Sequence, residues 1–451
     1  MQTPICDFVR DYAAGNTLRL HMPGHKGVPL LGMEHLDITE IAGADSLYEA
    51  GGIIARSEEN ASALFGCRTF YSTEGSSQCI RAMLYLVLLH AKGQGRRPLI
   101  AAGRNAHKTF LTAAALLDFQ VRWLYPRTGA GYLCCEPDAR ELEAYLQSTP
   151  EPPAAVYLTS PDYLGNIADV AALAAVCRRH GVLLVVDNAH GAYLKFLPES
   201  RHPMDLGADL CCDSAHKTLP ALTGGAYLHL SREMEQSLGH RVRDGLMLFG
   251  STSPSYLILQ SLDAVNAYLE DYPRRLAAFA RRVRALRGRL EAHGFRLCGS
   301  EPLKLTFDAA AYGYTGLALA QYLRQKGMEP EFADRDHLVL MLTPENGMDA
   351  LARLERVLCA LEPREPIREP APACPRGVQR MSIREALLSQ SETLPVERCL
   401  GRILAIPTVA CPPAVPILVC GEEITAQAID CFTYYGITEC CVIKEQEATW
   451  N

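Results

Sequence analysis

Short apolar segments alternate with amphipathic stretches from about residue 60 of the chain onward. The apolar segments carry hydrophobic residues at nearly every position and lie at 98–103, 121–126, 154–160, 182–187, 208–214 and 224–230. Stretches with helical periodicity, such as 168–180, separate them. Strands that are apolar on both faces and alternate with helices are typical of a mostly parallel sheet that is covered on both sides. The pattern therefore predicts an α/β fold.

After about residue 255 the pattern predicts a second structural unit. A long helical stretch at about 255–291 leads to apolar strands at 303–307 and 337–343 and to helices at 315–326 and 347–361. Two short strands with two helices are too few for another large sheet. We therefore expect a small α+β domain here.

Proline and glycine mark the limits of these units. Residues 362–375 contain five prolines, and because proline fixes φ and removes a backbone donor, this segment is predicted to be a stiff, extended linker. Residues 1–30 are predicted to form an irregular arm rather than a helix. A helix at 381–390 and a strand near 440–445 are expected toward the C-terminus. The predicted division is an arm (1–30), a large domain (31–260), a small α+β domain (261–361), a Pro-rich linker (362–377) and a C-terminal domain (378–451).

Composition narrows the classes of function. The chain has 451 residues, with 44 Lys and Arg against 51 Asp and Glu, and this mildly acidic balance argues against nucleic acid or an anionic membrane as the main partner. The first residues include Asp7 and Asp11 and no continuous apolar region, so we expect no secretory signal, and no uncharged apolar stretch is long enough for a membrane span. The 17 cysteines form no paired clusters with zinc spacing. We expect reduced, buried cysteines in a cytoplasmic protein without a metal site.

Candidate chemistry gathers at the ends of the predicted strands, where ligands bind in open α/β sheets. Only eight lysines occur, and three of them, Lys26, Lys108 and Lys217, directly follow a histidine. Asp187 ends the strand 182–187, and Lys217 lies in Ser-Ala-His-Lys (214–217) after the next strand. A lysine amine in a desolvated cleft loses its charge more easily, which suits imine formation with an aldehyde cofactor.

Two upstream segments complete this pattern. Residues 72–77, Ser-Thr-Glu-Gly-Ser-Ser, precede an apolar helix at 78–90, and a helix N-terminus with serine hydroxyls suits a phosphate. His107 follows the strand 98–103 and offers a ring that can stack on an aromatic cofactor. Each feature alone also has an ordinary structural explanation, such as a helix cap. In this order they predict a pyridoxal-phosphate site, in which Asp187 keeps the pyridine nitrogen protonated.

With these residues in place, the chain resembles the fold type I, pyridoxal-phosphate-dependent Orn/Lys/Arg decarboxylases, in the short form without an N-terminal wing domain. The resemblance rests on LRLHMPGHKG (18–27), GADSLYEAGGIIARSEENASALFG (43–66), RNAHK (104–108), SPDYLGNIADV (160–170), DNAHGAYLKF (187–196), SAHKTLPALTGGAYLH (214–229), STSPSY (251–256) and CPPAVPILVCGEEI (411–424). It implies an aspartate aminotransferase-like, cofactor-binding large domain. It also implies decarboxylation of arginine, lysine or ornithine to the amine and CO2, which feeds polyamine metabolism.

The resemblance also implies roles for individual residues. Lys217 would form the imine with the cofactor, Asp187 would pair with the pyridine nitrogen, and His107 and Ala189 would pack on the two ring faces. The remaining cofactor contacts that it implies are Gly75, Ser76, Ser77, His190, Ser214, His216 and Thr252. Thr252 would reach the site from a partner subunit, so a homodimer with sites at its interface is expected. Either Lys217 or His216 would donate the proton to Cα.

Substrate recognition is less determined. The cationic head group of a basic amino acid needs an acid, for which Glu422 is our first candidate and Asp162 the second, although either can equally be a solvated surface carboxylate. The chain departs from the family pattern at Asp162, Asn188, 411–416 and 420–422. These departures concern the identity of the substrate more than the class of reaction.

Two other functions remain as alternatives. An aminotransferase would need an arginine that holds the substrate carboxylate, and Arg324 and Arg335 are available in the predicted small domain. A non-catalytic regulatory relative would be expected to lack Lys217 or Asp187, and both are present.

Overall fold

The computed structural model of the chain describes residues 1–407 and 413–445, so Cys411 and Pro412 of the C-terminal motif lie outside the described residues. Two compact units make up the chain. Unit 1 consists of Met1–Arg97, Thr149–Ser160 and Asp169–Ala278, and unit 2 of Pro98–Ser148, Pro161–Ala168 and Phe279–Asn451.

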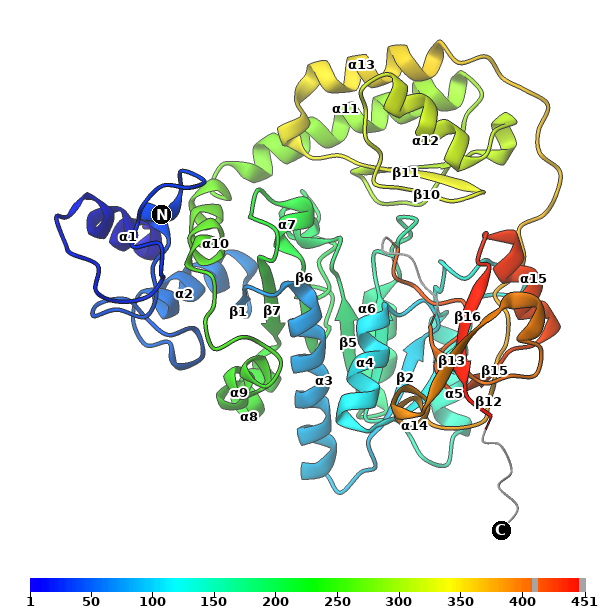
Figure 1. The fold of residues 1–451 in the computed structure, drawn as a ribbon, viewed down its shortest axis with the longest axis horizontal. Coiled ribbons are helices and arrows are strands. Elements are labelled where there is room, and N and C mark those ends of the chain that lie inside the picture. Colours follow the sequence, from blue (N-terminus) through cyan, green and yellow to red (C-terminus); the bar gives the residue numbers. More distant parts are fainter. Residues whose placement is uncertain (408–412, 446–451) are drawn as a thin grey trace. The chain divides into compact units, whose positions relative to one another are not determined.

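Unit 1 is built on a mixed sheet whose strands follow the order β1, β7, β6, β5, β4 (Figure 1). The bounds are β1 (Arg68–Ser72), β4 (Ala155–Thr159), β5 (Leu183–Asp187), β6 (Leu210–Asp213) and β7 (Ala226–Leu230). The neighbours β4, β5 and β6 run parallel, whereas β7 is antiparallel to both β6 and β1. The parallel core and its apolar strands confirm the predicted α/β class.

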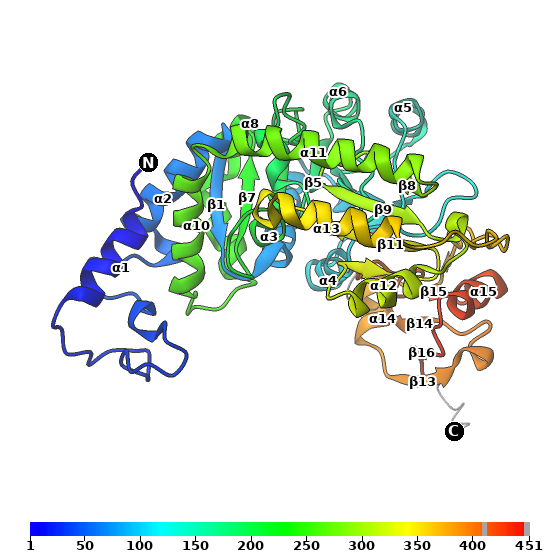
Figure 2. The ribbon, with the colours of Figure 1, turned by 90° about the horizontal axis from the view of Figure 1, so that it is seen from above.

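Helices cover this sheet, and unit 1 also contains a helix that the sequence pattern did not predict. Helix α3 (Gly75–Gly93) packs on β6 and β7, and α6 (Val170–Arg179) packs on β5. The expectation of a wholly irregular arm at 1–30 is wrong for its first half, because α1 (Pro4–Ala14) is a helix that packs with α2 (Ile53–Phe65) and α10 (Tyr256–Tyr268) (Figure 2). Proline in the first turn and the Asp263 carboxylate, which accepts from the backbone N–H groups of Ile5 and Cys6, stabilise its N-terminus. The other helices here are α7 (Ala215–Thr218), α8 (Arg232–Leu238) and α9 (Val242–Met247).

The helical stretch predicted at about 255–291 is two helices. Helix α10 ends at Tyr268, and α11 (Tyr272–Ala292) begins with Pro273 in its first turn. Proline has no N–H to continue the hydrogen-bond ladder of α10, so a new helix starts at this point.

Unit 2 contains the parallel pair β2 (Leu99–Gly103) and β3 (Gln120–Leu124), together with α4 (Lys108–Leu117) and α5 (Ala139–Ser148). A second, antiparallel sheet follows the order β10, β11, β9, β8. Its strands are β8 (Arg296–Cys298), β9 (Lys304–Asp308), β10 (Phe332–Ala333) and β11 (His337–Met341), and its helices are α12 (Gly316–Gln325) and α13 (Gly347–Cys359). These bounds agree with the predicted strands and helices of a small α+β domain. Residues 362–377 form neither helix nor strand, as expected of an extended linker.

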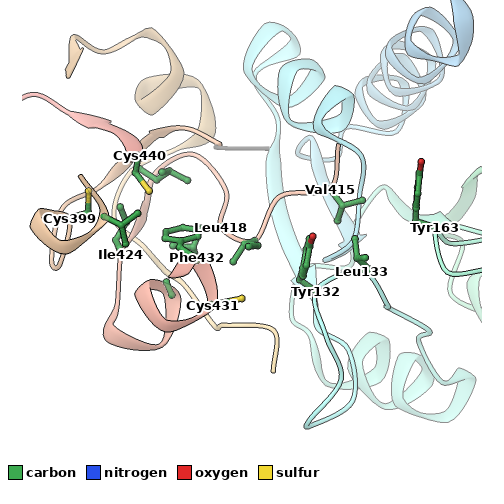
Figure 3. Close-up of a cluster of buried hydrophobic side chains, with 14 of the residues drawn as sticks. Tyr132, Leu133, Tyr163, Cys399, Val415, Leu418, Ile424, Cys431, Phe432 and Cys440 are labelled. Carbon is green, nitrogen blue, oxygen red and sulfur yellow. The ribbon is translucent and has the colours of Figure 1, made fainter. Parts of the chain in front are cut away.

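The C-terminal part of unit 2 contributes to a hydrophobic cluster that it shares with other segments of the unit. It comprises β12 (Val378–Gln379), α14 (Ile383–Leu388), β13 (Ser391–Pro395), β14 (Leu404–Ile406), β15 (Glu422–Glu423), α15 (Ala426–Tyr434) and β16 (Glu439–Ile443). Figure 3 shows the cluster, in which Leu418, Ile424 and Phe432 gather with Tyr132 and Leu133 from the segment after β3. Among the described residues, no helix is both long and apolar enough to cross a membrane.

Candidate active site

Asp187 is a buried carboxylate at the C-terminal end of β5, as the sequence predicts. Its side chain is 2% exposed and accepts hydrogen bonds from the Tyr157 hydroxyl (3.2 Å) and from the backbone N–H of Ala189 (3.2 Å). Burial raises the pKa of Asp187, and the nearby charge of Lys217 opposes this effect. A carboxylate that burial has made more basic holds a cationic partner strongly, as a protonated pyridine requires.

Lys217 lies in the short helix α7, directly after β6. Its Nζ is 3.1 Å from Nε2 of His190, a buried residue of the segment that follows Asp187. The backbone N–H of Lys217 donates to the carbonyl of Ser214 (3.0 Å), which fixes the turn between strand and helix. The two strand ends β5 and β6 thus bring an amine, an imidazole and a carboxylate together in unit 1.

A hydroxyl cluster lies where α3 begins. The Ser214 hydroxyl donates to that of Ser76 (2.8 Å), and Ser76 and Ser77 occupy the first turn of α3, where backbone N–H groups have no partner within the helix. Gly75 has φ +71° and donates its own N–H to the carbonyl of Gly224 (2.8 Å). The N–H of Gly75 is therefore already used, whereas the first turn after it and the serine hydroxyls fit a phosphate.

His216 is half-buried and turned toward the loop before β7. Its Nδ1 donates to the Gly225 carbonyl (2.9 Å), so a neutral ring carries its lone pair on Nε2. Burial lowers the pKa of His216. A neutral imidazole of this tautomer accepts a proton at Nε2 before it can donate one.

His107 belongs to unit 2 and is the N-cap of α4. Its Nδ1 accepts from the backbone N–H of Thr109 (3.2 Å), and it lies 2.9 Å from the Thr109 hydroxyl. These bonds fix the orientation of the ring. Stacking of His107 on a cofactor stays a prediction.

The two candidate substrate carboxylates are both buried within unit 2 and already have partners. Asp162 is 2% exposed and accepts from the backbone N–H (2.9 Å) and the side-chain amide (2.8 Å) of Asn166. Glu422 is 1% exposed and forms an ion pair with the Arg104 guanidinium at 3.0 Å. The alternative of a solvated surface carboxylate is therefore wrong for both residues, whereas their contact with a substrate stays a prediction.

The other predicted residues lie in different surroundings. Ala189 is buried, and Thr252 is exposed in unit 1. The two arginines considered for an aminotransferase are paired with acids of their own unit, Arg324 with Glu329 at 2.7 Å and Arg335 with Glu369. Both guanidinium groups already form ion pairs within the protein, so the structure offers no support for an aminotransferase.

Sequence reasoning missed two sets of residues near Asp187. Tyr157 on β4 reaches Asp187 from the neighbouring strand, and Asn188 donates to the carboxylate of Asp213 (2.6 Å). The sequence offered one signal for these residues, namely their position. Each of them lies in, or directly after, a strand that neighbours β5 or β6. Asp213 is the last residue of β6, as Asp187 is of β5, so the same positional signal was available for it.

Known proteins resemble this chain in sequence and in fold. The family model for the Orn/Lys/Arg decarboxylase major domain matches residues 3–292. The Bacillus subtilis protein YaaO is 28% identical over 95% of this chain and 93% of its own length, and an arginine decarboxylase from Halalkalibacterium halodurans is 29% identical over 94% and 91%. Among solved structures, the constitutive lysine decarboxylase of E. coli superimposes with a TM-score of 0.79 at 17% identity, covering 98% of this chain and 82% of that one. Serine palmitoyltransferase from Sphingomonas wittichii gives a TM-score of 0.56 at 15% identity over 79% and 83%.

Proposed function

Because the chain belongs to the Orn/Lys/Arg decarboxylase family, we propose that it removes the α-carboxylate of L-arginine, which makes the corresponding amine for polyamine synthesis. The protein is a pyridoxal-phosphate-dependent amino-acid decarboxylase of fold type I. We place arginine ahead of lysine and ornithine because, in sequence, arginine decarboxylases match 94–95% of this chain at 27–29% identity, whereas the lysine decarboxylase LdcA of Pseudomonas aeruginosa matches 60% of it at 24% identity.

The observation that carries the proposal is the group of Asp187, Lys217 and the Ser76–Ser214 hydroxyls at one end of the sheet of unit 1. Pyridoxal phosphate supplies, when bound, an aldehyde for the substrate amine and a protonated ring that withdraws electrons from Cα. Asp187 would hold the ring nitrogen, Ser76, Ser77 and Ser214 would hold the phosphate, and Lys217 would hold the aldehyde carbon. The burial and partners of these side chains fit these three tasks.

Proton transfer is assigned to the pair of Lys217 and His190. Their nitrogen atoms are 3.1 Å apart, within range for direct exchange of a proton. His190 would take a proton from the Lys217 ammonium and later return it, so that Lys217 would be protonated again when it delivers a proton to Cα after loss of CO2. His216 stays as the second candidate donor, which has to gain a proton at Nε2 first.

Recognition of the guanidinium is assigned to a buried carboxylate of unit 2. Glu422 is already bonded to Arg104, whereas the partners of Asp162 are the amide groups of Asn166. A carboxylate without a bonded cation has more to gain from a guanidinium. We therefore place Asp162 ahead of Glu422, which reverses the order that the sequence alone suggests.

The arm supports a homodimer. Leu18, Leu20, Leu30 and Leu31 are 78–85% exposed, although Arg19 donates to the carbonyls of Glu34, His35 and Asp37 and so gives the arm a defined shape. A patch of exposed leucines on an ordered segment is typical of a subunit interface. Exposure of Thr252 is consistent with a site that it completes in a second subunit.

Incubation of the purified protein with pyridoxal phosphate and each of the three amino acids tests the reaction. We expect CO2 and an amine from arginine in the absence of a keto-acid acceptor, and faster turnover than with lysine or ornithine. Lys217→Ala should abolish turnover and the visible absorbance of the bound cofactor. Lys92→Ala, which removes an exposed lysine of α3, should change neither. Turnover by Lys217→Ala at the wild-type rate would contradict the assignment.

The molar mass of the purified protein, measured by light scattering, tests the proposed dimer. A Leu20→Glu, Leu30→Glu double variant should shift the mass from twice that of one chain toward that of a single chain. Leu388→Glu alters a leucine of α14 that is 69% exposed and should leave the mass unchanged. A wild-type protein that is monomeric at assay concentration would refute the homodimer.

A further inference from the structure

A buried charged network lies in unit 1 behind the candidate active site. Asp213, at the end of β6, is fully buried, and one of its oxygens accepts from Nδ2 of Asn188 at 2.6 Å. The other oxygen is 3.0 Å from Nε2 of His202 and 3.1 Å from Nε2 of His229. All four side chains are 0% exposed, so these protein partners rather than bulk water stabilise the carboxylate.

The hydrogen bonds determine where the protons of this network lie. The Thr69 hydroxyl lies 3.2 Å from the Cys67 carbonyl oxygen and 2.9 Å from Nδ1 of His229. Nε2 of His229 faces the Asp213 carboxylate, which can only accept, so this nitrogen carries a hydrogen. His202 accepts from the Met204 N–H at Nδ1, so its Nε2 carries the hydrogen that points to Asp213 and has no lone pair for a metal ion.

The pKa values follow from these contacts. Burial alone would raise the pKa of Asp213, but His202 and His229 lower it well below its usual range. Burial likewise opposes the charge on His229, while Cys67 and Asp213 raise its pKa. The result is a buried hydrogen-bonded network that links β1, β7 and β6 to the residue after β5.

Side-chain alternation places this network on the opposite face of the sheet from Asp187. Asp187 and Cys212 share one face, where the Cys212 thiol is 3.7 Å from the Asp187 carboxylate, and the following residues, Asn188 and Asp213, share the other. The backbone N–H of Asn188 donates to the Cys212 carbonyl at 3.0 Å. Packing around Asn188 is tight, because a Cβ on Gly191 would lie 1.9 Å from its Oδ1.

From this arrangement we infer that Asn188 and Asp213 are positioning residues that hold the ends of β5 and β6 in register, and so orient Asp187 and Lys217 toward the cofactor. The inference rests on the roles proposed above for Asp187 and Lys217. Neither Asn188 nor Asp213 is required to touch the cofactor. Each is adjacent in sequence to a residue of the site, so loss of their bond frees the backbone on which Asp187, Ser214 and Lys217 stand.

Binding of pyridoxal phosphate to the apoprotein tests this inference without any measurement of turnover. Asn188→Ala should weaken cofactor affinity by about tenfold or more, because misplacement of reacting groups by about 1 Å has effects of that order, and should change the visible circular dichroism of the bound cofactor. Asn266→Ala is the matched control. Asn266 is also 0% exposed in unit 1. Its Nδ2 donates to Ser57 of α2 and to Tyr71 of β1 rather than to residues at the ends of β5 and β6.

Both alanine variants should lower the thermal midpoint of the apoprotein, but only Asn188→Ala should change affinity and dichroism. Equal effects of the two variants on affinity, or wild-type affinity and dichroism in folded Asn188→Ala, would overturn the inference. Failure of the proposed roles of Asp187 and Lys217 is distinguishable, because Asp187→Ala and Lys217→Ala would then bind cofactor as the wild type does.

A charge swap keeps the test valid if Asn188→Ala does not fold. Asn188→Asp places a second carboxylate against Asp213 and should weaken cofactor affinity by about tenfold or more. The double variant Asn188→Asp, Asp213→Asn again pairs one carboxylate with one amide, with the positions of the two groups exchanged. It should recover most of the lost affinity, whereas additive losses in the double variant would refute a positioning pair.

Discussion

Replacement of Asp162 by asparagine should make the protein more stable at pH 8 and slightly less stable at pH 4. Burial, the largest cause, raises the pKa of Asp162 to about 6, although the hydrogen bonds from Asn166 and the charge of Lys304 favour the ionised form. The ordinary pKa of an aspartate side chain is 3.8. Between these two pKa values the folded protein therefore keeps a proton at Asp162 that the unfolded chain has already released.

The sign and size of the effect follow from this difference. A carboxyl group whose pKa is raised by folding favours the folded state below about pH 4, and this contribution is lost as pH rises through about 6. A tenfold change in proton affinity is worth about 1.4 kcal/mol, so ionised Asp162 costs the folded protein about 3 kcal/mol at pH 8. The amide of the Asp162→Asn variant has no charge to bury, but it gives up about 1 kcal/mol of hydrogen bonding to Asn166. We expect a net gain of about 2 kcal/mol at pH 8 and a net loss of about 0.5 kcal/mol at pH 4.

Urea unfolding of wild type and Asp162→Asn at pH 4, 6 and 8 measures this effect. Asp430→Asn, an exposed substitution on α15 of the same unit, is the control and should change the free energy of unfolding little. A stability difference for Asp162→Asn that is constant from pH 4 to pH 8 would refute the reasoning about burial. The same variant also tests the proposed substrate contact, because loss of a bonded guanidinium partner should raise KM for arginine by about tenfold or more.

Two further substitutions test the buried ion pair of Glu422 and the proposed proton transfer at Lys217. Glu422→Gln leaves the Arg104 cation buried without its carboxylate and should destabilise the protein by about 3–5 kcal/mol in the same urea assay; a loss below about 1 kcal/mol would show that the pair is not structural. His190→Ala removes the ring nitrogen 3.1 Å from Lys217 and should lower kcat/KM and displace its pH profile while the cofactor stays bound; an unchanged profile would remove His190 from proton transfer.

The parts of the fold that the sequence predicts well are those with strong periodicity. The all-apolar run at 182–187 ends in a single polar residue, so both β5 and the place of Asp187 at its edge can be predicted. The strand β1 is missed because Arg68-Thr69-Phe70-Tyr71-Ser72 has too many polar residues to resemble a buried strand. Its position beside β7, antiparallel and largely buried, is a property of the folded sheet rather than of those five residues.

The arm and the candidate substrate residue Glu422 show why the remainder could not be predicted. Helix α1 is stabilised by Asp263, whose carboxylate accepts from the first N–H groups of the helix. Because Asp263 is more than 250 residues away in the chain, local propensity underestimates the stability of α1. Glu422 has no basic neighbour in the local sequence, yet it meets Arg104 through the folding of the C-terminal segment. In each case a partner distant in sequence decides the structure of a locally ambiguous residue.

The bonded partners of the buried carboxylates separate structural roles from binding roles. Asp213 accepts from the imidazole rings of His202 and His229, and Glu422 accepts from a guanidinium, so basic groups of the protein itself already bind each of them. Asp187 accepts from a hydroxyl, a thiol and a backbone N–H, all of them neutral, and burial raises its pKa. A cationic ligand lowers the electrostatic cost of burying Asp187, whereas at Glu422 it has to compete with Arg104. This contrast, rather than the position of the residues in a motif, is the physical reason to assign the ring nitrogen to Asp187 and to regard Glu422 first as the partner of Arg104.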